Sequence, residues 1–428
     1  MHRSRSHAAA LALALVLLFV GAALGPALAA GQSNESQPLA GDPVAVGVQG
    51  VGSYSTGGYV GRVADGDMAW RESSADTYFD VTPRSDGTVL VAVTQNDAED
   101  CGSYDPPCAR TGYRVVDPDG PRVVSEWTFP VRSHTNSEVH DVEQLPGGGV
   151  LVADMDRERV LVVENGSVTW SWNASARYDP PAEPTRTDWL HINDVDRIAE
   201  GRYLVSVRNA NQILVLRRGE GVVEVINRDP DGGERIRGDP DVLNHQHNPQ
   251  WLGDGAVLVA DSENHRVVEL HRTESGSWEP AWTLAGAGGT ALDWPRDADR
   301  LADGTTLVTD TRNARVVVVD EEGRLLARHR FDYRTLPYEA DVAGGEPVGG
   351  PRYGVPSNAT PGGSATTPGG SGAATPVQGP RPVPVLTPAL RLLSAAVRLP
   401  RWVGEGHLLA ATLALVAGGA ALVVRVRG

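Results

Sequence analysis

Four segments of the chain repeat one pattern of residues, and this repeat limits the fold more than any other feature. The segments cover residues 140–163, 193–216, 247–270 and 296–319. Each has an inner run such as Asp-Val-x-x-Leu, a turn with Gly, and then two valine-rich runs. Equivalent leucines and isoleucines recur about every 50 residues, a period typical of β-propeller blades. One such sheet cannot bury both of its faces, so we expect the repeats to stack around a central channel.

The propeller is predicted to cover residues 43–333. A weaker copy of the repeat begins at Phe79, and residues 43–70 supply strands for the least regular blade, where we expect the ring to close. Blades of roughly 45–50 residues fit about six times into this region. The expected fold class is therefore all-β, a six-bladed β-propeller, with functional residues near the channel.

Both ends of the chain predict a membrane location. Residues 1–30 contain Arg3 and Arg5, then an apolar run, then small residues typical of a cleavage site. This is the pattern of a secretory signal peptide, and a retained membrane helix is the alternative. Residues 408–424 form an uncharged apolar run with basic residues directly after it, which predicts a transmembrane helix whose end lies inside the cell. We therefore expect a single-pass protein of the cell membrane with an extracellular propeller.

Two segments connect the propeller to the predicted transmembrane helix. Residues 344–382 are rich in Pro, Gly, Ser and Thr, which predicts a disordered stalk. Residues 386–402 space apolar residues and arginines so that an amphipathic helix could lie on the membrane surface. The membrane is thus an expected partner of the C-terminal part.

The acidic composition predicts a solvated surface rather than a binding surface for a charged partner. The net charge is −16, and every one of the 38 basic residues is Arg. An acidic, lysine-free chain of this kind is typical of halophilic proteins, whose acidic residues form a solvated surface. Nucleic-acid binding requires a basic surface, so no nucleic-acid partner is expected.

Two features fit an extracellular location. Cys101 and Cys108 are the two cysteines, and their spacing predicts a disulfide that closes a short loop. Glycosylation sequons occur at Asn34, Asn165, Asn173 and Asn358, so a glycoprotein is expected.

Four histidines occupy equivalent positions of the repeat. His140 and His247 lie five residues before the leucine or isoleucine that recurs in each repeat. His191 and His245 lie seven residues before it. In a ring, these positions converge at the start of the innermost strands, at one mouth of the channel. A single histidine there would most simply cap a strand, but four predict a site for proton transfer or metal binding.

The segments around these histidines resemble the bacterial arylsulfotransferase family. DWLHIND at 188–194 with LVSVR at 204–208 resembles one family signature, and NHQHNPQ at 244–250 resembles another. The resemblance extends over about residues 55–330, and VADSENHRVVEL is also similar to an NHL repeat. It implies a six-bladed propeller that moves a sulfuryl group from an aryl sulfate to a phenol through a transiently sulfated histidine. It further implies that His191 and His247 are sulfuryl ligands or acid–base groups, and that Arg208 holds the sulfuryl oxygens.

The chain departs from the family at the nucleophile. The family's nucleophilic histidine precedes a Trp-x-x-Pro-like stretch, and here residues 288–295 read GGTALDWP without histidine. Either His245, His247 or His140 has taken that role, or transfer is lost.

Two alternatives to sulfuryl transfer follow. In the first, His140, His191 and His247 hold a metal ion in the channel of a propeller lyase or hydrolase. In the second, the propeller is a non-catalytic surface module that binds a small anion or another ligand. Apart from that metal ion, no cofactor is expected.

Overall fold

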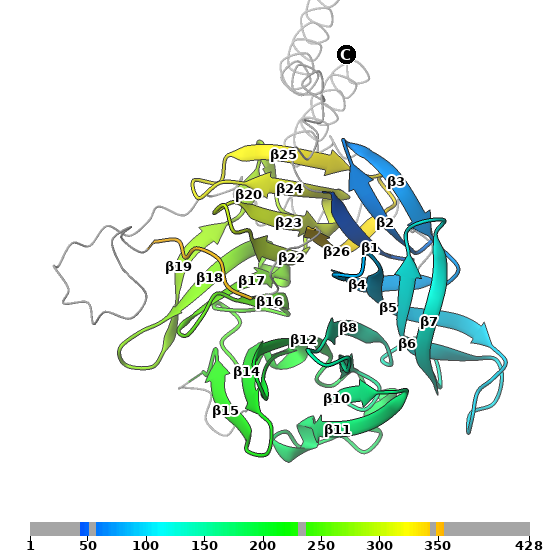
Figure 1. Ribbon diagram of the computed structural model, residues 1–428. Helices are drawn as coiled ribbons and strands as arrows, with labels where there is room; N and C mark the ends of the chain where they lie inside the picture. Colours follow the sequence, from blue (N-terminus) through cyan, green and yellow to red (C-terminus); the bar gives the residue numbers. More distant parts are fainter. Residues whose placement is uncertain (1–42, 51–56, 230–236, 343–347, 355–428) are drawn as a thin grey trace, which may run out of the picture. The chain divides into compact units, whose positions relative to one another are not determined.

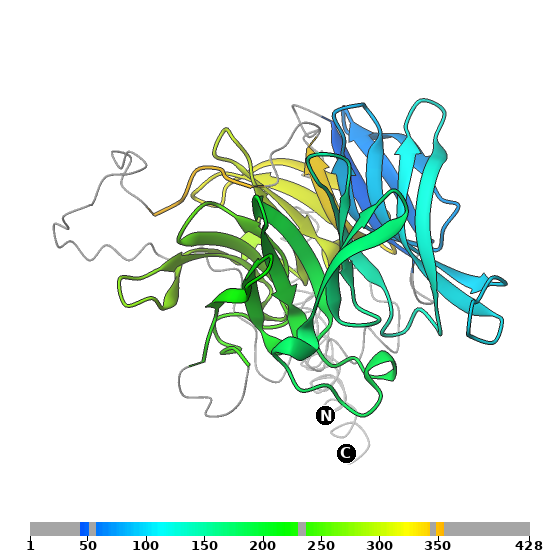
Figure 2. The same cartoon turned by 60° about the horizontal axis from the view of Figure 1, so that its bottom comes forward.

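The innermost strands form a ring of six sheets in the computed structural model, which describes residues 43–50, 57–229, 237–342 and 348–354. Figure 1 shows β4, β8, β12, β16, β22 and β26 around the centre, and Figure 2 shows the same sheets turned by 60°. Each sheet has four antiparallel strands, so the predicted six-bladed all-β propeller is confirmed.

Five blades are built from strands that follow one another in the chain. In chain order, the first of these blades consists of β4 (Thr77–Pro83), β5 (Val89–Ala98), β6 (Cys108–Asp117) and β7 (Arg122–Val131), and the second of β8 (Val139–Gln144), β9 (Val150–Asp154), β10 (Arg159–Glu164) and β11 (Ser167–Asn173). The third consists of β12 (Ile192–Ala199), β13 (Arg202–Val207), β14 (Gln212–Arg217) and β15 (Gly221–Ile226), and the fourth of β16 (His247–Trp251), β17 (Ala256–Asp261), β18 (Arg266–Arg272) and β19 (Trp278–Leu284). The fifth consists of β22 (Pro295–Arg300), β23 (Thr306–Asp310), β24 (Arg315–Val319) and β25 (Leu325–Arg330).

The sixth blade closes the ring with both ends of the propeller. It consists of β1 (Val44–Gln49), β2 (Tyr59–Ala64), β3 (Asp67–Glu72) and, as its innermost strand, β26 (Leu336–Val342). β26 pairs antiparallel with β1, from Val44 opposite Val342 to Gln49 opposite Leu336. The propeller therefore extends past residue 333, the boundary expected from the repeats.

Short elements lie in the turns between strands and between blades. They are the hairpin β20 (Gly286–Ala287) with β21 (Thr290–Ala291) and the 3-10 helices η1 (Ala174–Ala176), η2 (Pro184–Arg186), η3 (Arg208–Ala210), η4 (Ser262–Asn264) and η5 (Thr311–Asn313). η3, η4 and η5 each follow the second strand of a blade and end in a left-handed residue. The repeat thus places equivalent turns at one end of three consecutive blades.

Valine-rich strands fill the space between blades. Leu204, Val215 and Val257, for example, belong to one buried cluster that joins two neighbouring blades. Burial of such side chains stabilises the ring by about 25 cal/mol per Å² of apolar surface. Outer strands carry tryptophans: Trp282 is 7% exposed and donates its indole N–H to the carbonyl of Glu321.

An aspartate–arginine pair recurs within the blades. Asp154 pairs with Arg159 at 2.6 Å, Asp261 with Arg266 at 2.7 Å, and Asp310 with Arg315 at 2.6 Å. In each blade the aspartate ends the second strand and the arginine begins the third, so the pair fixes the turn between them. This is the structural role of the Asp and Arg that recur in the sequence repeat.

Innermost strands are also joined from blade to blade by acidic side chains. Asp80 accepts the backbone N–H of Val142 in the next blade at 3.3 Å, and Asp297 accepts that of Ala340 at 3.1 Å. Asp141 accepts the N–H of Val195 in the same way. Each bond satisfies a backbone donor at the channel edge, where no further strand is available.

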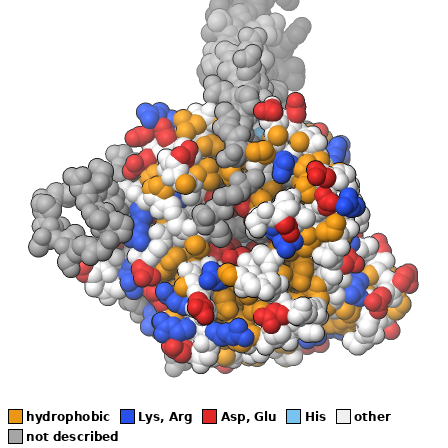
Figure 3. All heavy atoms as spheres, in the orientation of Figure 1, with side chains coloured by type: hydrophobic (Ala, Val, Ile, Leu, Met, Phe, Trp, Pro, Cys, Tyr) orange, Lys and Arg blue, Asp and Glu red, His pale blue; other side chains and the backbone are white. Residues whose placement is uncertain are grey.

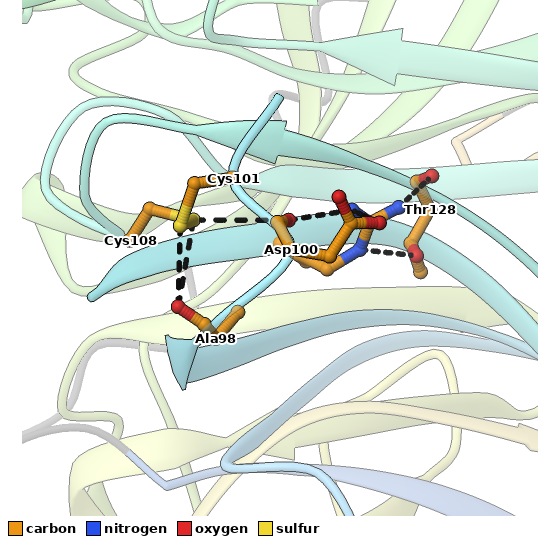
Figure 4. The surroundings of a disulfide bond; sticks show 6 residues. Ala98, Asp100, Cys101, Cys108 and Thr128 are labelled. Carbon is orange, nitrogen blue, oxygen red and sulfur yellow. Dashed lines mark hydrogen bonds and ion pairs between the residues drawn. A yellow bond between two sulfur atoms is a disulfide. The ribbon is translucent and has the colours of Figure 1, made fainter. Parts of the chain in front are cut away.

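Cys101 and Cys108 form a disulfide with their Cα atoms 5.7 Å apart. It closes the loop between β5 and β6 (Figure 4). Arg110 donates to the carbonyl of Asp100 at 2.9 Å and to that of Thr128 at 2.8 Å, which holds the loop against β7.

The predicted segments 1–30, 386–402 and 408–424 lie outside the described residues, as does most of the predicted stalk 344–382. Within the described ranges, no helix is long and apolar enough to cross a membrane. Residues 348–354 pack on the propeller: Val348 forms a β-bridge with Trp251, and Tyr353 is 4% exposed. The face shown in Figure 3 mixes acidic and arginine side chains among the described residues.

Candidate functional site

The first residues of the innermost strands converge at one end of the channel. Six equivalent positions are occupied by Phe79, His140, Asn193, His247, Arg296 and Tyr338. The rings of His140 and Tyr338 stack at 5.7 Å, and the rings of His247 and Tyr338 lie 6.0 Å apart. His191 joins them, because its ring stacks on that of His140 at 5.0 Å. The structure thus brings together three of the four histidines singled out from the sequence.

His140 lies in the middle of this group and has free ring nitrogens. It is 3% exposed, and neither Nδ1 nor Nε2 has a hydrogen-bond partner among the described residues. Its nearest acid is Glu138, at 3.7 Å from Nε2. Burial lowers the pKa of His140, and the positive charges of His191 and the neighbouring arginines lower it further. Burial raises the pKa of Glu138 to about 8, so both groups are uncharged at neutral pH.

His247 has a fixed tautomer. Its Nδ1 lies 2.8 Å from Oγ of Ser262, and that hydroxyl donates to the carbonyl of Pro295 at 2.6 Å. Because the hydroxyl proton is used, the imidazole must donate from Nδ1, which leaves the lone pair on Nε2. Burial, followed by the charges of Arg296 and Arg208, lowers the pKa of His247 well below its usual range. At neutral pH this side chain is a neutral imidazole.

His191 forms an acid–base pair with a carboxylate. Its Nδ1 lies 2.8 Å from Oδ1 of Asp188, and that oxygen also accepts a hydrogen bond from Asn209 at 3.1 Å. Burial lowers the pKa of His191, while the hydrogen bond to Asp188 opposes the change. This pair is the arrangement that lets an imidazole accept and return a proton.

Arg208 reaches the same site through the antiparallel geometry of its blade. Ile192 at the start of β12 pairs with Val207 at the end of β13, so Arg208 follows directly beside His191. The backbone N–H of Arg208 donates to the carbonyl of His191 at 3.3 Å, and its guanidinium donates to Asn209 at 2.7 Å. Its charge lowers the pKa of His191 and His247.

His245 lies at the edge of this group rather than within it. Its Nδ1 pairs with Oδ1 of Asn244 at 2.7 Å, and its backbone N–H donates to Asn211 at 3.0 Å. Burial, followed by the charge of Arg208, lowers the pKa of this histidine. Its position suits contact with a ligand at the rim.

Arg296 and Tyr338 belong to the site although the sequence did not single them out as functional. The Arg296 guanidinium lies 3.9 Å from the ring centre of Trp294 and 4.7 Å from that of Tyr338, and it hydrogen-bonds Gln49. Arg296 is 7% exposed, and its Nε has no partner among the described residues. Burial lowers the pKa of Arg296 to about 10, so the side chain remains charged at neutral pH.

The backbone at the site is strained. His191, His245 and Trp294 occupy the same position of the repeat, and each has a positive φ: 55°, 50° and 58°. Side chains other than Gly rarely adopt this conformation, which costs on the order of 1–3 kcal/mol for each residue. Strain of this kind is concentrated at functional sites, where the surrounding structure maintains it.

We call His140, His191, His247, Arg208 and Arg296 the His–Arg cluster. At neutral pH its charges come mainly from two guanidinium groups, with Asp188 as the facing carboxylate. The arginines disfavour protonation of the histidines, and an anion bound between them would relieve this repulsion. The arrangement therefore suits an anion.

The histidines do not form a metal site in this arrangement. Throughout the described ranges, no group of three or more His, Cys, Asp or Glu side chains is placed to hold a metal ion. The geometry thus favours the anion interpretation of these residues over the metal alternative.

The fold and the site define a six-bladed β-propeller with a His–Arg cluster at one mouth of its channel. A comparison with models of known protein families finds no match, and a comparison with curated protein sequences finds none either. The resemblance to arylsulfotransferases therefore remains a hypothesis based on motifs.

Solved structures with a similar fold are propellers at low sequence identity. A protein of unknown function from Bacteroides caccae has a TM-score of 0.50 and 14% identity, over 70% of this chain and 97% of that one. Virginiamycin B lyase from Staphylococcus aureus has a TM-score of 0.37 and 10% identity, over 59% and 70%. The WD40 β-propeller domain of Doa1 has a TM-score of 0.42 and 12% identity, over 70% and 88%. At these identities the likeness shows the fold alone.

Proposed function

We propose that the protein transfers a sulfuryl group from an aryl sulfate to a phenol at the His–Arg cluster, from the extracellular side of the cell membrane. The observation that carries the proposal is the convergence of neutral imidazoles with one buried guanidinium group, that of Arg296, and one partly buried, that of Arg208, beside aromatic rings. A sulfate ester combines an anionic sulfuryl group with an aromatic ring, so it matches both parts of this site.

His247 is the proposed nucleophile, in place of the histidine absent from residues 288–295. Its Nδ1–H is held by Ser262, so its Nε2 carries the lone pair that attacks sulfur. The S–O bond to the aryl group breaks as the N–S bond forms, and the phenolate leaves. In the second half of the cycle the acceptor phenol attacks the same sulfur and the N–S bond breaks.

His191 is the proposed proton carrier. The sulfate ester, bound between the arginines, raises the pKa of His191, so this ring binds a proton in the complex with substrate. The departing phenolate takes that proton, and the acceptor phenol returns a proton to the neutral ring in the second step. Asp188, at 2.8 Å, stabilises the protonated form. Protons therefore balance over one full cycle without an additional reactant.

Arg296 and Arg208 are the proposed clamps for the sulfuryl oxygens. A planar guanidinium donates two parallel hydrogen bonds to such a group and neutralises its charge during transfer. Arg296 has an unused Nε and is fixed between Trp294 and Tyr338, so it needs little reorganisation when the anion binds. Trp294 belongs to the segment where the family's nucleophile would lie, and its ring contacts the guanidinium groups of Arg296 and Arg312.

Turnover of a chromogenic aryl sulfate with a phenol acceptor tests the proposal. We expect activity in the wild type, a loss of at least a hundred-fold in His247→Ala, and no loss in His271→Ala. His271 is a suitable control because it lies on β18 and pairs with Glu269 away from the cluster. If the wild type binds sulfate without turnover, the site is a non-catalytic anion-binding module and the transfer proposal is wrong.

A further inference from the structure

The channel contains a second feature, an acidic chamber beyond the His–Arg cluster. It is a cavity of about 570 Å³ lined by the later residues of the innermost strands and by residues 348–351. Its first layer of acids consists of Asp80, Asp141, Asp194, Asp297 and Glu339. This volume falls within the roughly 300–1,000 Å³ of small-molecule pockets. A ligand of several carbon and nitrogen atoms therefore fits in it.

Most acids of the first layer have a structural role. Asp80, Asp141 and Asp297 each accept a backbone N–H from the next blade, as described above, and Glu339 accepts that of Val81 at 3.4 Å. These acids would be present in the ring without any ligand. An acidic layer alone is thus no sign of a binding site.

Asp194 is the exception, and the sequence of the next blade explains it. The residue that would donate to Asp194 is Pro249, which occupies the position of Val142 and Val195 and has no N–H. Asp194 is 5% exposed and lines the chamber, and its Oδ1 has no hydrogen-bond partner among the described residues. A buried carboxylate oxygen without a donor is costly, so it indicates a missing cationic or donor group.

A second acceptor faces the same missing group. Asn248, beside Pro249, donates from its amide nitrogen to Glu339 at 2.7 Å, while its Oδ1 has no partner among the described residues. Asn248 also lines the chamber. An unpaired carboxylate oxygen and an unpaired amide oxygen both accept hydrogen bonds, so the missing group must donate them.

Among the described residues, the cationic side chain that lines the chamber is already bonded to other groups. Arg300 lines the chamber, but its guanidinium lies 3.0 Å from Glu269 and donates to Thr306 at 3.0 Å and to the carbonyl of Pro351 at 2.6 Å. A second layer of acids, Glu143, Asp196, Asp299 and Asp341, lies farther along the strands. The chamber therefore lacks a counterion among the described residues.

The spacing of the acids decides the kind of cation. A bare metal ion needs several ligands around one point, and no group of three such side chains is placed for this in the described part of the chain. The acids are instead distributed along two layers of the cavity. Cationic groups separated by short carbon chains match this distribution, since each can meet a different carboxylate.

We propose that the acidic chamber binds an aliphatic polyamine, with one ammonium group held by Asp194 and Asn248 and the others held by the second layer of acids. A terminal ammonium group donates three hydrogen bonds and an internal one donates two, and both carry the positive charge that the chamber lacks. The burial that raises the pKa of the acids also means that a bound polyamine would displace protons from them.

Calorimetric titration of the full-length protein with spermidine tests this proposal. We expect saturable binding with release of protons, detected as a heat that depends on the ionisation enthalpy of the buffer. Asp194→Asn should weaken binding at least ten-fold. Pro249→Ala restores a backbone donor for Asp194 and should weaken binding several-fold, without removing any acid. Asp320→Asn, which removes a carboxylate paired with Arg324 outside the channel, should leave binding unchanged.

Three results would overturn the proposal. Spermidine binding that all three variants retain would place it on the acidic surface. Calcium or magnesium binding without spermidine binding would show a metal site instead. Wild-type protein that binds neither would show an empty chamber. Thermal unfolding of each variant is measured alongside, and if Asp194→Asn does not fold, Pro249→Ala decides the outcome.

Discussion

The chemistry proposed for His247 depends on one hydroxyl group. Ser262 donates to the carbonyl of Pro295 and so can only accept from Nδ1 of His247. Because Nδ1 therefore carries the proton, the free lone pair of the imidazole lies on Nε2. Ser262 occupies in its blade the position that Arg208 occupies in the preceding one, each directly after the second strand. One position of the repeat therefore supplies a positioning residue in one blade and a cation in another.

Replacement of Ser262 tests this dependence. Ser262→Ala should reduce the rate of sulfuryl transfer roughly ten-fold or more, because the imidazole loses its orientation and tautomer. Ser262→Thr, which keeps the hydroxyl, should restore most of the rate, and Ser275→Ala on an exposed turn should have no effect. A Ser262→Ala protein with unchanged kcat and pH profile would show that the hydroxyl has no part in the reaction.

The charges around the histidines predict how they titrate. Burial and the arginines hold the pKa of His191 and His247 below 6.5, so sulfate bound between these groups should raise both values. NMR titration of the imidazole resonances, with and without sulfate at matched chloride, measures the change. Arg208→Ala should raise the two pKa values without sulfate and reduce the further shift that sulfate causes. The absence of any sulfate-dependent shift would argue against an anion site.

At the scale of single elements, the disulfide ties the loop between β5 and β6. Loop closure of this length stabilises a fold by roughly 2–3 kcal/mol in the chain-entropy model. Reduction, or Cys101→Ser with Cys108→Ser, should lower the free energy of unfolding by about this amount while the His–Arg cluster keeps its activity. Denaturant unfolding measures the first effect and the sulfate assay the second. A parallel loss of activity would show that this blade is coupled to the site.

The elements differ in how well the sequence predicted them. The repeat predicted the strands of five blades and the convergence of His140 and His247, because period and hydrophobic pattern are local properties. β26 was outside the predicted range because it has neither a Gly turn nor a following valine-rich strand. Tyr338 was missed with it, since only ring closure places that strand beside β1.

The details of the site depend on contacts between blades, which a single repeat does not contain. The role of Ser262 depends on the next blade, where the carbonyl of Pro295 accepts a hydrogen bond from its hydroxyl group. Arg296 was recognised as equivalent to His140, but its contacts with Trp294 and Tyr338 come from two different blades. Pro249 reads as an ordinary strand residue until Asp194 of the preceding blade is placed beside it.

At the scale of the whole molecule, the channel should make stability depend on pH. Burial raises the pKa of Asp141, Asp297 and Asp341 to about 7 and that of Glu143 to about 8. At pH values above the usual pKa of a carboxyl group, the folded protein therefore binds more protons than the unfolded chain. The free energy of unfolding then falls as pH rises. The histidines with lowered pKa act in the opposite sense, but only below about pH 6.5.

The range from pH 6.5 to pH 8 isolates the carboxyl groups. Across it the free energy of unfolding should fall by about 1.4 kcal/mol per pH unit for each extra proton that the folded state holds. Denaturant unfolding at fixed salt measures this slope, and Asp341→Asn should reduce it, whereas Asp320→Asn, outside the channel, should not. Stability that stays constant or rises over this range would show that the channel acids are already ionised in the folded protein.

The central claim is that the His–Arg cluster carries a sulfuryl group on His247. The most direct measurement is the mass of the full-length protein after incubation with an aryl sulfate and no acceptor. We predict an added mass of one sulfuryl group, located on His247 by peptide mapping, removed when a phenol is added, and absent in His247→Ala. An unmodified wild-type protein that also fails to release phenol, or an adduct on another residue that persists in His247→Ala, would contradict the account.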